Sequence, residues 1–525
     1  MRYGFVIDHR RCIGCHACTV ACKEENRVPL GAFRTWVKYV EKGTFPDTRR
    51  YFSVLRCNHC DDAPCVTICP TVALYRRPDG IVDFDNRRCI GCKSCMQACP
   101  YDALYIDPDT NTAAKCHFCA HRLEVGLEPA CVIVCPERAI IAGDLDDPRT
   151  EIARMVAREQ VEVRKPEQGT RPKVFYVGAD SSALTPQLQR PAATYMFGQR
   201  PAAEADLVQM VAALQAKEAG GDGTLSRPVY DAPHAAQPWG WRVSAYLWTK
   251  SIAAGVLLVA AFGGAWDRLF TVAAPALSLL FLALTTALLV LDLRRADRFA
   301  YIVLKPNWRS WLVWGAWILM AFGAGAGVWL LGGVTGHHAL IKLIAVPTIV
   351  LALATAGYSA FLFGQAEGRD FWQSPLVLPH LIVAAVVAGS AALIVAVAVL
   401  ARPEACRDRM YASAACFDPR ALDGLTPILL VALVIHVALL GLELFSRHPV
   451  RDVSLAARLI TRGAYRVRFW AGVVAVGVVA PIALVLGGAM LDSSVVSALA
   501  ALLALGGLWL WEDLWIKAGQ AVPLS

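Results

Sequence analysis

The sequence predicts two parts of different fold class, a small α+β domain followed by an all-α bundle of about eight transmembrane helices. Three observations lead to this prediction. Sixteen of the eighteen cysteines lie within the first 136 residues. Residues from about 241 onward are dominated by Ala, Leu, Val, Gly and Trp. Of the 525 residues, 56% are hydrophobic and 18% are charged, which favours a chain with several apolar spans.

The sixteen N-terminal cysteines form four runs with one pattern. Each run holds three cysteines, a gap of three residues and a fourth cysteine. The runs are Cys12, Cys15, Cys18, Cys22; Cys57, Cys60, Cys65, Cys69; Cys89, Cys92, Cys95, Cys99; and Cys116, Cys119, Cys131, Cys135. This is the spacing of bacterial-type 4Fe–4S ligation, in which the fourth cysteine usually serves the other cluster of a pair. Sixteen ligands are enough for four 4Fe–4S clusters, which are the cofactors that we expect.

Zinc and disulfide bonds are the alternatives for so many cysteines. Zinc needs only four ligands per site and gives no reason for three-cysteine runs or for the Cys-Pro endings of three runs. Disulfides suit small secreted domains. The N-terminal residues MRYGFVIDHRRC contain no apolar segment, so we expect no signal peptide. The four agreeing spacings therefore favour clusters.

Short extended segments accompany the cysteine runs. Residues 3–8 and 81–85 precede two runs, and residues 103–107 follow the third. A unit of two strands and a helix around each pair of clusters is the ferredoxin pattern, so we expect a ferredoxin-like iron–sulfur domain over residues 1–180. This region resembles the four-cluster iron–sulfur subunit of molybdopterin oxidoreductases, the family of dimethyl sulfoxide, polysulfide and tetrathionate reductases.

The resemblance implies how the runs are paired, first with fourth and second with third. The implied ligand sets are Cys12, Cys15, Cys18 with Cys135; Cys116, Cys119, Cys131 with Cys22; Cys57, Cys60, Cys65 with Cys99; and Cys89, Cys92, Cys95 with Cys69.

Residues 181–240 are expected to connect the two parts. Nearby, residues 149–164 have helical spacing and residues 169–178 read as one extended segment. A second helix is expected at about 202–218, and the Pro-rich residues 226–239 are expected to be loop. We assign this connector no chemistry.

From Trp241 the chain forms the transmembrane domain, residues 241–525. Eight apolar stretches are long enough to cross a bilayer. They lie near 243–265, 269–292, 310–332, 339–363, 377–400, 425–445, 467–490 and 494–516. This half resembles the NrfD-like membrane subunits that handle quinol, through residues 238–255, 291–299, 358–375 and 518–525. In the better-known enzymes the two halves are separate subunits, whereas here they are fused.

Ionisable residues inside spans are costly and usually mark function. A quinone head group needs a hydrogen-bond donor and a proton route. Lys250 and Tyr358 fit the donor role, and the resemblance implies a quinone contact at Tyr358. His380, His436 and Glu443 are candidates for carrying protons, with menaquinone and ubiquinone both open. Snorkelling to the interface is the alternative for Lys250.

Charge in the loops predicts sidedness. With an even number of spans, the basic loops 293–309 and 446–466 lie on the iron–sulfur side, so the positive-inside rule places that domain in the cytoplasm, at the inner membrane. Alternatively, these arginines dock the iron–sulfur domain, whatever its compartment. The opposite loop carries Cys406 and Cys416, for which a disulfide and two free thiols both stay open.

These features predict an electron-transfer and membrane-anchor component that links the quinone pool to a separate molybdopterin catalytic subunit. The formal charge of +8 is explained by arginines near the membrane, and no basic stripe suggests nucleic acid. No nucleotide-binding, haem or hydrolase motif is found. The alternatives are a proton-coupled, quinol-oxidising component with a cytochrome partner, and a passive anchor without a quinone site. The terminal substrate and the direction of electron flow stay open.

Overall fold

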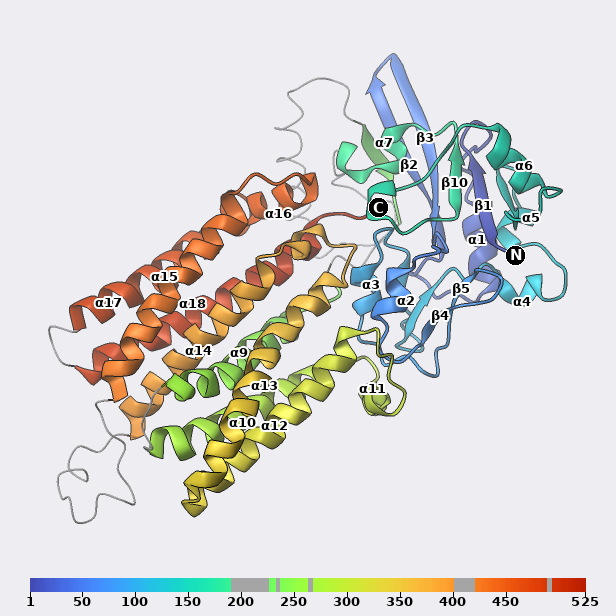
Figure 1. Ribbon diagram of the computed structural model, residues 1–525. Coiled ribbons are helices and arrows are strands. Elements are labelled where there is room, and N and C mark those ends of the chain that lie inside the picture. Colours follow the sequence, from blue (N-terminus) through green and yellow to red (C-terminus); the bar gives the residue numbers. More distant parts are fainter. Residues whose placement is uncertain (190–225, 233–236, 263–267, 401–420, 489–492) are drawn as a thin grey trace, which may run out of the picture.

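The computed structural model describes the chain apart from residues 190–225, 233–236, 263–267, 401–420 and 489–492. Figure 1 shows a domain of strands and short helices at one end of a long helical bundle. The helix expected at about 202–218 and the loop with Cys406 and Cys416 lie outside the described residues.

A four-stranded sheet organises the N-terminal domain. Its order is β8 (Ile140–Asp144), β1 (Tyr3–Asp8), β10 (Val174–Val177) and β9 (Val161–Glu162). β1 runs parallel to β10 and antiparallel to β8, and its central residues Phe5, Val6 and Ile7 are fully buried. Helix α6 (Glu151–Arg158) packs on this sheet through Ile152. The predicted helix over 149–164 is therefore shorter, because Val161 and Glu162 pair with β10 instead.

A long hairpin, β2 (Thr35–Thr44) and β3 (Asp47–Arg56), forms a second sheet. Its third strand is β11 (Arg227–Tyr230), which pairs with β2. The expectation that residues 226–239 are all loop is wrong for these four residues. The backbone of β2 offers hydrogen-bonding groups at its free edge, and a segment with proline is tolerated in such an edge strand.

Two small hairpins and several short helices lie next to the cysteine runs in the chain. The strands predicted at 3–8, 81–85 and 103–107 are present, the last two within the small hairpins. The hairpins are β4 (Leu74–Arg76) with β5 (Val82–Phe84), and β6 (Leu104–Ile106) with β7 (Ala113–Lys115). The short helices are α1 (Ala17–Glu25), α2 (Pro64–Ile68), α3 (Ser94–Ala98), α4 (Ala120–Leu123), α5 (Ala130–Ile133) and α7 (Ser181–Leu184).

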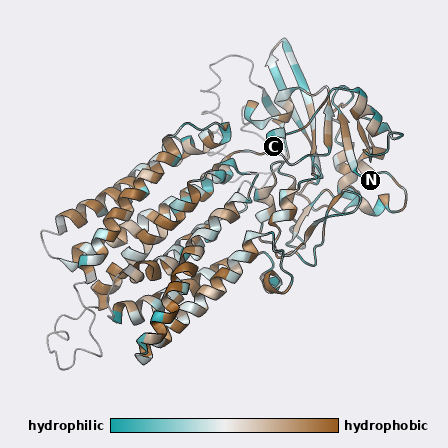
Figure 2. Ribbon diagram, in the orientation of Figure 1, coloured by the Kyte–Doolittle hydropathy of each residue, from teal (hydrophilic) through white to brown (hydrophobic). Residues whose placement is uncertain are grey.

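The described residues contain eight helices that are long and apolar enough to cross a membrane, as predicted. Figure 2 shows that hydrophobic residues dominate this bundle. The spans are α9 (Trp241–Phe262), α10 (Ala274–Asp292) with the π-helical turn Leu269–Ala273 before it, α12 (Trp311–Thr335), α13 (His338–Gly364), α14 (Val377–Leu400), α15 (Ala421–Phe445), the π-helical segment Arg468–Val479 continued by α17 (Ala480–Gly488), and α18 (Ser494–Ala521). Two short helices, α11 (Tyr301–Leu304) and α16 (Arg451–Thr461), lie in the connecting segments.

Helix α9 is the central helix of the bundle, and almost all of it is buried. It packs against α10, α13, α14 and α18. Helix α9 closely approaches α14 at Gly255 and Gly389, whose backbones are in contact. Small residues permit such close crossings in membranes, where packing and hydrogen bonds hold helices together. Helix α9 therefore positions its polar residues at the middle of the bundle.

Candidate functional site

The sixteen cysteines gather in four groups of four, and all are free thiols. Three groups line small cavities. They are Cys12, Cys15, Cys18 and Cys135; Cys22, Cys116, Cys119 and Cys131; and Cys69, Cys89, Cys92 and Cys95. In the remaining group, Cys57, Cys60, Cys65 and Cys99 are close enough for their charges to interact. Below, the groups that contain Cys12, Cys22, Cys57 and Cys92 are called the first, second, third and fourth thiol groups. Each group draws its members from two runs, and its assignment as the ligand set of one cluster stays a prediction.

The four groups form a series. Cys18 of the first group lies near Cys131 of the second, and Cys116 of the second lies near Cys57 of the third. Cys95 of the fourth group lies near Cys65 of the third. The series runs from the exposed Cys15 to the buried face against the membrane bundle.

Each of the three small cavities is lined by cysteines from two different runs. Across the residues with described positions, no three His, Cys, Asp or Glu side chains converge as a single metal ion requires. A 4Fe–4S cube holds its four ligands farther apart than a single zinc ion does, so this spread of the thiols is compatible with cluster ligation. Burial raises the pKa of Cys18, Cys92 and Cys116 to about 12 in each case, so cluster binding must release their protons.

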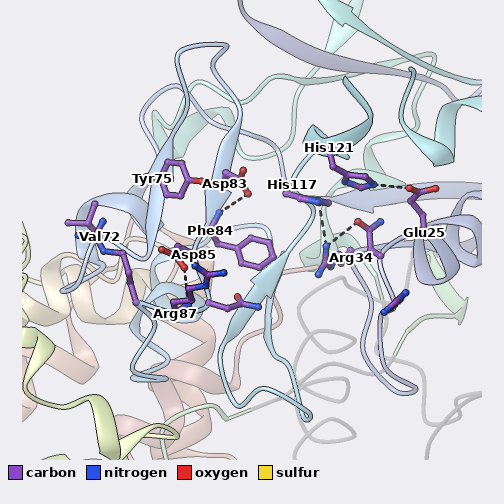
Figure 3. A pocket seen from close by; sticks show the side chains of 14 residues that line it. Glu25, Arg34, Val72, Tyr75, Asp83, Phe84, Asp85, Arg87, His117 and His121 are labelled. Atoms are coloured by element: carbon purple, nitrogen blue, oxygen red, sulfur yellow. Dashed lines mark hydrogen bonds and ion pairs between the residues drawn. The ribbon is translucent and has the colours of Figure 1, made fainter. Parts of the chain in front are cut away.

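A polar hollow of about 1020 Å³ opens beside the second thiol group (Figure 3). In it, Arg34 approaches His117, while His121 bonds Glu25 at 2.7 Å. Burial lowers the pKa of His117 to about 3. The charged lining and wide opening make this hollow unsuited to an apolar quinone.

An apolar cavity of about 830 Å³ lies where the N-terminal domain meets the bundle. Residues of α9, α10, α12 and α13 line it, with Cys92 and Ser94 at the end next to the fourth thiol group. Its polar groups include the side chains of Tyr246, Asp292 and Tyr358. An apolar pocket with a few convergent polar groups is the usual form of a site for a small organic ligand.

Tyr358 lies in the wall of this cavity, and Lys250 lies behind it. The Lys250 Nζ is 5.0 Å from the centre of the Tyr358 ring. It donates to the Ala356 carbonyl and to Ser359 Oγ, both at 2.9 Å. Lys250 is completely buried, so the snorkelling alternative is wrong.

His380, His436 and Glu443 form a separate group between α14, α15 and α18. His380 Nδ1 and Glu443 Oε2 are 2.9 Å apart, and Trp515 Nε1 donates to Glu443 Oε1 at 2.8 Å. The His436 ring lies 4.9 Å from the His380 ring. The structure thus divides the five predicted membrane residues into two places. Tyr358 lines the cavity with Lys250 behind it, whereas the other three contact one another and are not among the described residues that line the cavity.

A buried polar network joins the two domains. Arg369 donates from Nε to Gln97 Oε1 at 2.9 Å, and Gln97 donates to Gln520 Oε1 at 2.6 Å. Trp239, which lines the cavity, donates from Nε1 to the Cys92 carbonyl at 3.1 Å. Lys93 pairs with Asp292 at 2.8 Å. These contacts hold the fourth thiol group at the mouth of the cavity.

The basic loop after α10 also contacts the N-terminal domain. Arg298 donates to the carbonyls of Asn86 and Cys89 at 2.6 and 3.2 Å. Arg295 reaches the Thr110 carbonyl. These arginines contact the iron–sulfur domain, as the docking alternative expects, and the sidedness of the domain stays a prediction.

Sequence reasoning missed Tyr246, Asp292 and Trp239 as cavity residues. All three lie in segments that carry the resemblance, which is the signal that could have pointed to them. Tyr246 is four residues before Lys250 on α9, hence on the same face. A search for charged residues within the spans does not identify Tyr246.

The fold and the site together define a membrane-bound iron–sulfur electron-transfer protein. Residues 232–523 match the family model described as polysulphide reductase, NrfD, and residues 48–145 match the 4Fe–4S dicluster domain. The chain therefore belongs to the NrfD polysulphide reductase family, with an iron–sulfur domain fused to its N-terminal side.

Curated relatives match the iron–sulfur part. A subunit of tetrathionate reductase from Salmonella typhimurium is 51% identical over 193 residues, which are 36% of this chain and 77% of the relative. The protein NrfC of Escherichia coli is 45% identical over 34% of this chain and 81% of its own length. The thiosulfate reductase electron transfer subunit PhsB of Salmonella typhi is 47% identical over 30% of this chain and 84% of the relative. The family prediction is confirmed.

Proposed function

We propose that the chain passes electrons between the quinone pool and a separate molybdopterin catalytic subunit, through four 4Fe–4S clusters. The observation that carries this proposal is the position of Cys92. It belongs to the last thiol group of the series and also lines the apolar cavity in the membrane bundle. A cluster held there would lie beside whatever occupies the cavity.

The arrangement of the thiol groups supports an electron-transfer role rather than a catalytic centre. A cubane with four thiolate ligands has no open position for substrate, and its surroundings set its potential. The ligand sets that we propose are those of the four groups described above. Their series leads from the exposed Cys15 to Cys92, so electrons would cross the whole iron–sulfur domain. The relatives' names include reductases for more than one sulfur compound, and the terminal substrate of this complex would be set by its catalytic subunit.

The cavity supports quinone binding. Its lining is mainly apolar, as an isoprenoid quinone requires, and the Tyr246 and Tyr358 hydroxyls provide donors for the head group. Oxidation of a quinol releases two electrons and two protons. The electrons would pass one at a time to the cluster at Cys92, and the two protons would leave the head group for solvent. The buried Lys250 would support Tyr358 from behind the cavity wall.

The quinone site is tested with Tyr358→Phe and Lys250→Met in membranes that contain the assembled complex. We expect quinone-linked turnover to fall at least tenfold, while cluster EPR signals and turnover with artificial dyes persist. Tyr465→Phe is the matched control, because Tyr465 is buried but does not line the cavity. Normal quinone turnover in both variants would place the site elsewhere.

Cluster content has its own test. Purified anaerobically, the chain should carry about sixteen iron and sixteen acid-labile sulfide per polypeptide. Stoichiometric zinc with little iron would contradict the ligation that we propose.

A second candidate function is proton coupling, supported by the group of His380, His436 and Glu443. All three side chains are at least 95% buried, and within the described chain His380 Nε2 and His436 Nδ1 have no hydrogen-bond partner. Buried ionisable groups in a membrane are expensive and mark proton or ion pathways. In sealed vesicles, His380→Gln and Glu443→Gln should lower the protons moved per electron, whereas the exposed His337→Gln should not. An unchanged ratio in both variants would exclude this role.

The chain is a multi-pass membrane protein, and we propose that it resides in the inner membrane with its iron–sulfur domain in the cytoplasm. Because Arg295 and Arg298 contact that domain, the charge argument now rests on the loop 446–466. Arg447 and Arg462 of this loop are exposed. Protease digestion of the iron–sulfur domain in spheroplasts with an intact inner membrane would contradict this sidedness.

A further inference from the structure

Each of the four cysteine runs follows a basic residue directly. The residues are Arg11, Arg56, Arg88 and Lys115. Their surroundings differ, since Arg11 is exposed and Arg88 is half-buried, whereas Arg56 is 1% exposed and Lys115 is fully buried. The two buried cations therefore need a separate explanation.

Arg56 ends strand β3 and points into the space between the first two thiol groups. Its Nη1 donates to Cys131 Sγ at 3.2 Å, and its guanidinium lies 4.4 Å from the centre of the Phe5 ring. Cys18 and Cys116 are also close enough to interact with its charge. Its Nε and Nη2 are buried without a hydrogen-bond partner among the described residues.

Lys115 ends strand β7 and lies close to the second and third thiol groups. Its Nζ donates to the carbonyl of Val82, and to that of Cys116 at 3.0 Å. Its charge acts on Cys65 of the third group.

Neither cation has a carboxylate partner within ion-pair distance in the part of the chain that is described. Among the other buried cations of this domain, Lys38, Lys93 and Lys173 pair with aspartates, whereas Arg164 donates to the carbonyls of Leu184 and Leu524. Burial of an unpaired charge costs several kcal/mol, so native proteins pair such charges. Around Arg56 and Lys115, the available anions are the cysteine thiolates and the clusters that they would hold.

We propose that Arg56 and Lys115 are positioning residues that set the reduction potentials of the inner clusters and compensate their charge. A cubane bound by four thiolates is anionic, and each added electron increases its negative charge. A cation fixed at 3.2 Å from a ligand sulfur stabilises the reduced form more than the oxidised form. The unpaired Nε and Nη2 of Arg56 are further donors for sulfur atoms of the clusters.

Together, the two cations would set the order of reduction potentials along the series of clusters. Arg56 acts on the first and second groups, and Lys115 on the second and third. Because the second cluster would lie near both Arg56 and Lys115, we expect it to be the easiest of the four to reduce. The inference rests on the iron–sulfur ligation proposed above. Failure of that ligation would appear separately, as low iron in the unaltered chain.

The experiment is an EPR redox titration of the purified complex with Arg56→Gln, Arg56→Lys and Lys115→Gln, each with its iron content measured. Loss of either charge should lower the equilibrium constant for reduction of one cluster at least tenfold, equal to about 59 mV for a one-electron couple. Arg56→Lys keeps the charge and should shift the potential much less. Arg164→Gln is the control, because Arg164 is equally buried but donates to the carbonyls of Leu184 and Leu524.

Cluster loss is also informative. If Arg56→Gln loses iron while Arg56→Lys retains it, charge compensation is supported. Iron loss in both variants would indicate that the shape of Arg56 matters rather than its charge, and would overturn the proposal. Unchanged potentials with full iron in Arg56→Gln and Lys115→Gln would overturn it as well.

Discussion

Replacement of Arg369 should slow electron transfer between the membrane cavity and the clusters of the iron–sulfur domain. Its side chain is 6% exposed and lies just after α13, between the two domains. It donates to Gln97 Oε1 at 2.9 Å, to the Gln520 carbonyl at 3.1 Å and to the Val522 carbonyl at 2.9 Å. Arg369→Met removes all three hydrogen bonds and leaves their acceptors buried.

The magnitude follows from these contacts. A hydrogen bond from a charged donor contributes about 1.5–3 kcal/mol, and the three are not additive because they share one guanidinium. Burial also lowers the pKa of Arg369 to about 10, so part of the interaction energy offsets its desolvation. We therefore expect Arg369→Met to weaken the junction by about 3–5 kcal/mol.

The assay is stopped-flow reduction of the clusters by a quinol analogue, compared with reduction by dithionite. Because electron transfer depends steeply on distance, we expect the quinol-driven rate to fall at least tenfold while the dithionite-reducible clusters stay complete. Arg462→Met, at an exposed arginine of the loop 446–466, should leave both unchanged. Normal quinol-driven rates and normal thermal stability in Arg369→Met would refute the role of the junction.

Two further predictions concern stability. Gly255→Ala should destabilise the bundle by about 1–3 kcal/mol, since a Cβ there would stand 1.7 Å from the Ala385 oxygen, whereas Gly506→Ala has open space and should be neutral in the same thermal unfolding measurement. Burial lowers the pKa of His9 from 6.5 to about 4, so the unfolded state binds more protons between these values and stability is lost as pH falls from 6.5 towards 4. His9→Gln should flatten that loss, measured as cluster bleaching temperature against pH; an equally steep loss in this variant would assign it to other groups.

The sequence by itself determined the features that are local along the chain. The spacing of the cysteine runs depends on a few neighbouring residues, because a Cys-x-x-Cys loop must reach irons of one cube. The eight spans follow from apolar composition summed over about twenty residues each. Both signals are independent of how distant segments meet, and the fold and family were therefore predictable.

Tertiary structure decided what depends on helix rotation, crossing and docking. Lys250 of α9 and Tyr358 of α13 are 108 residues apart in the chain. The packing of these two helices brings the Lys250 Nζ to 5.0 Å from the centre of the Tyr358 ring. The same packing creates the cavity beside Cys92, which no periodicity encodes. Arg56 looks like any basic residue before a cysteine, and only the fold buries it against Cys131 without a carboxylate. Burial and pairing are properties of the assembled core, and they decide which charges act on the electron path.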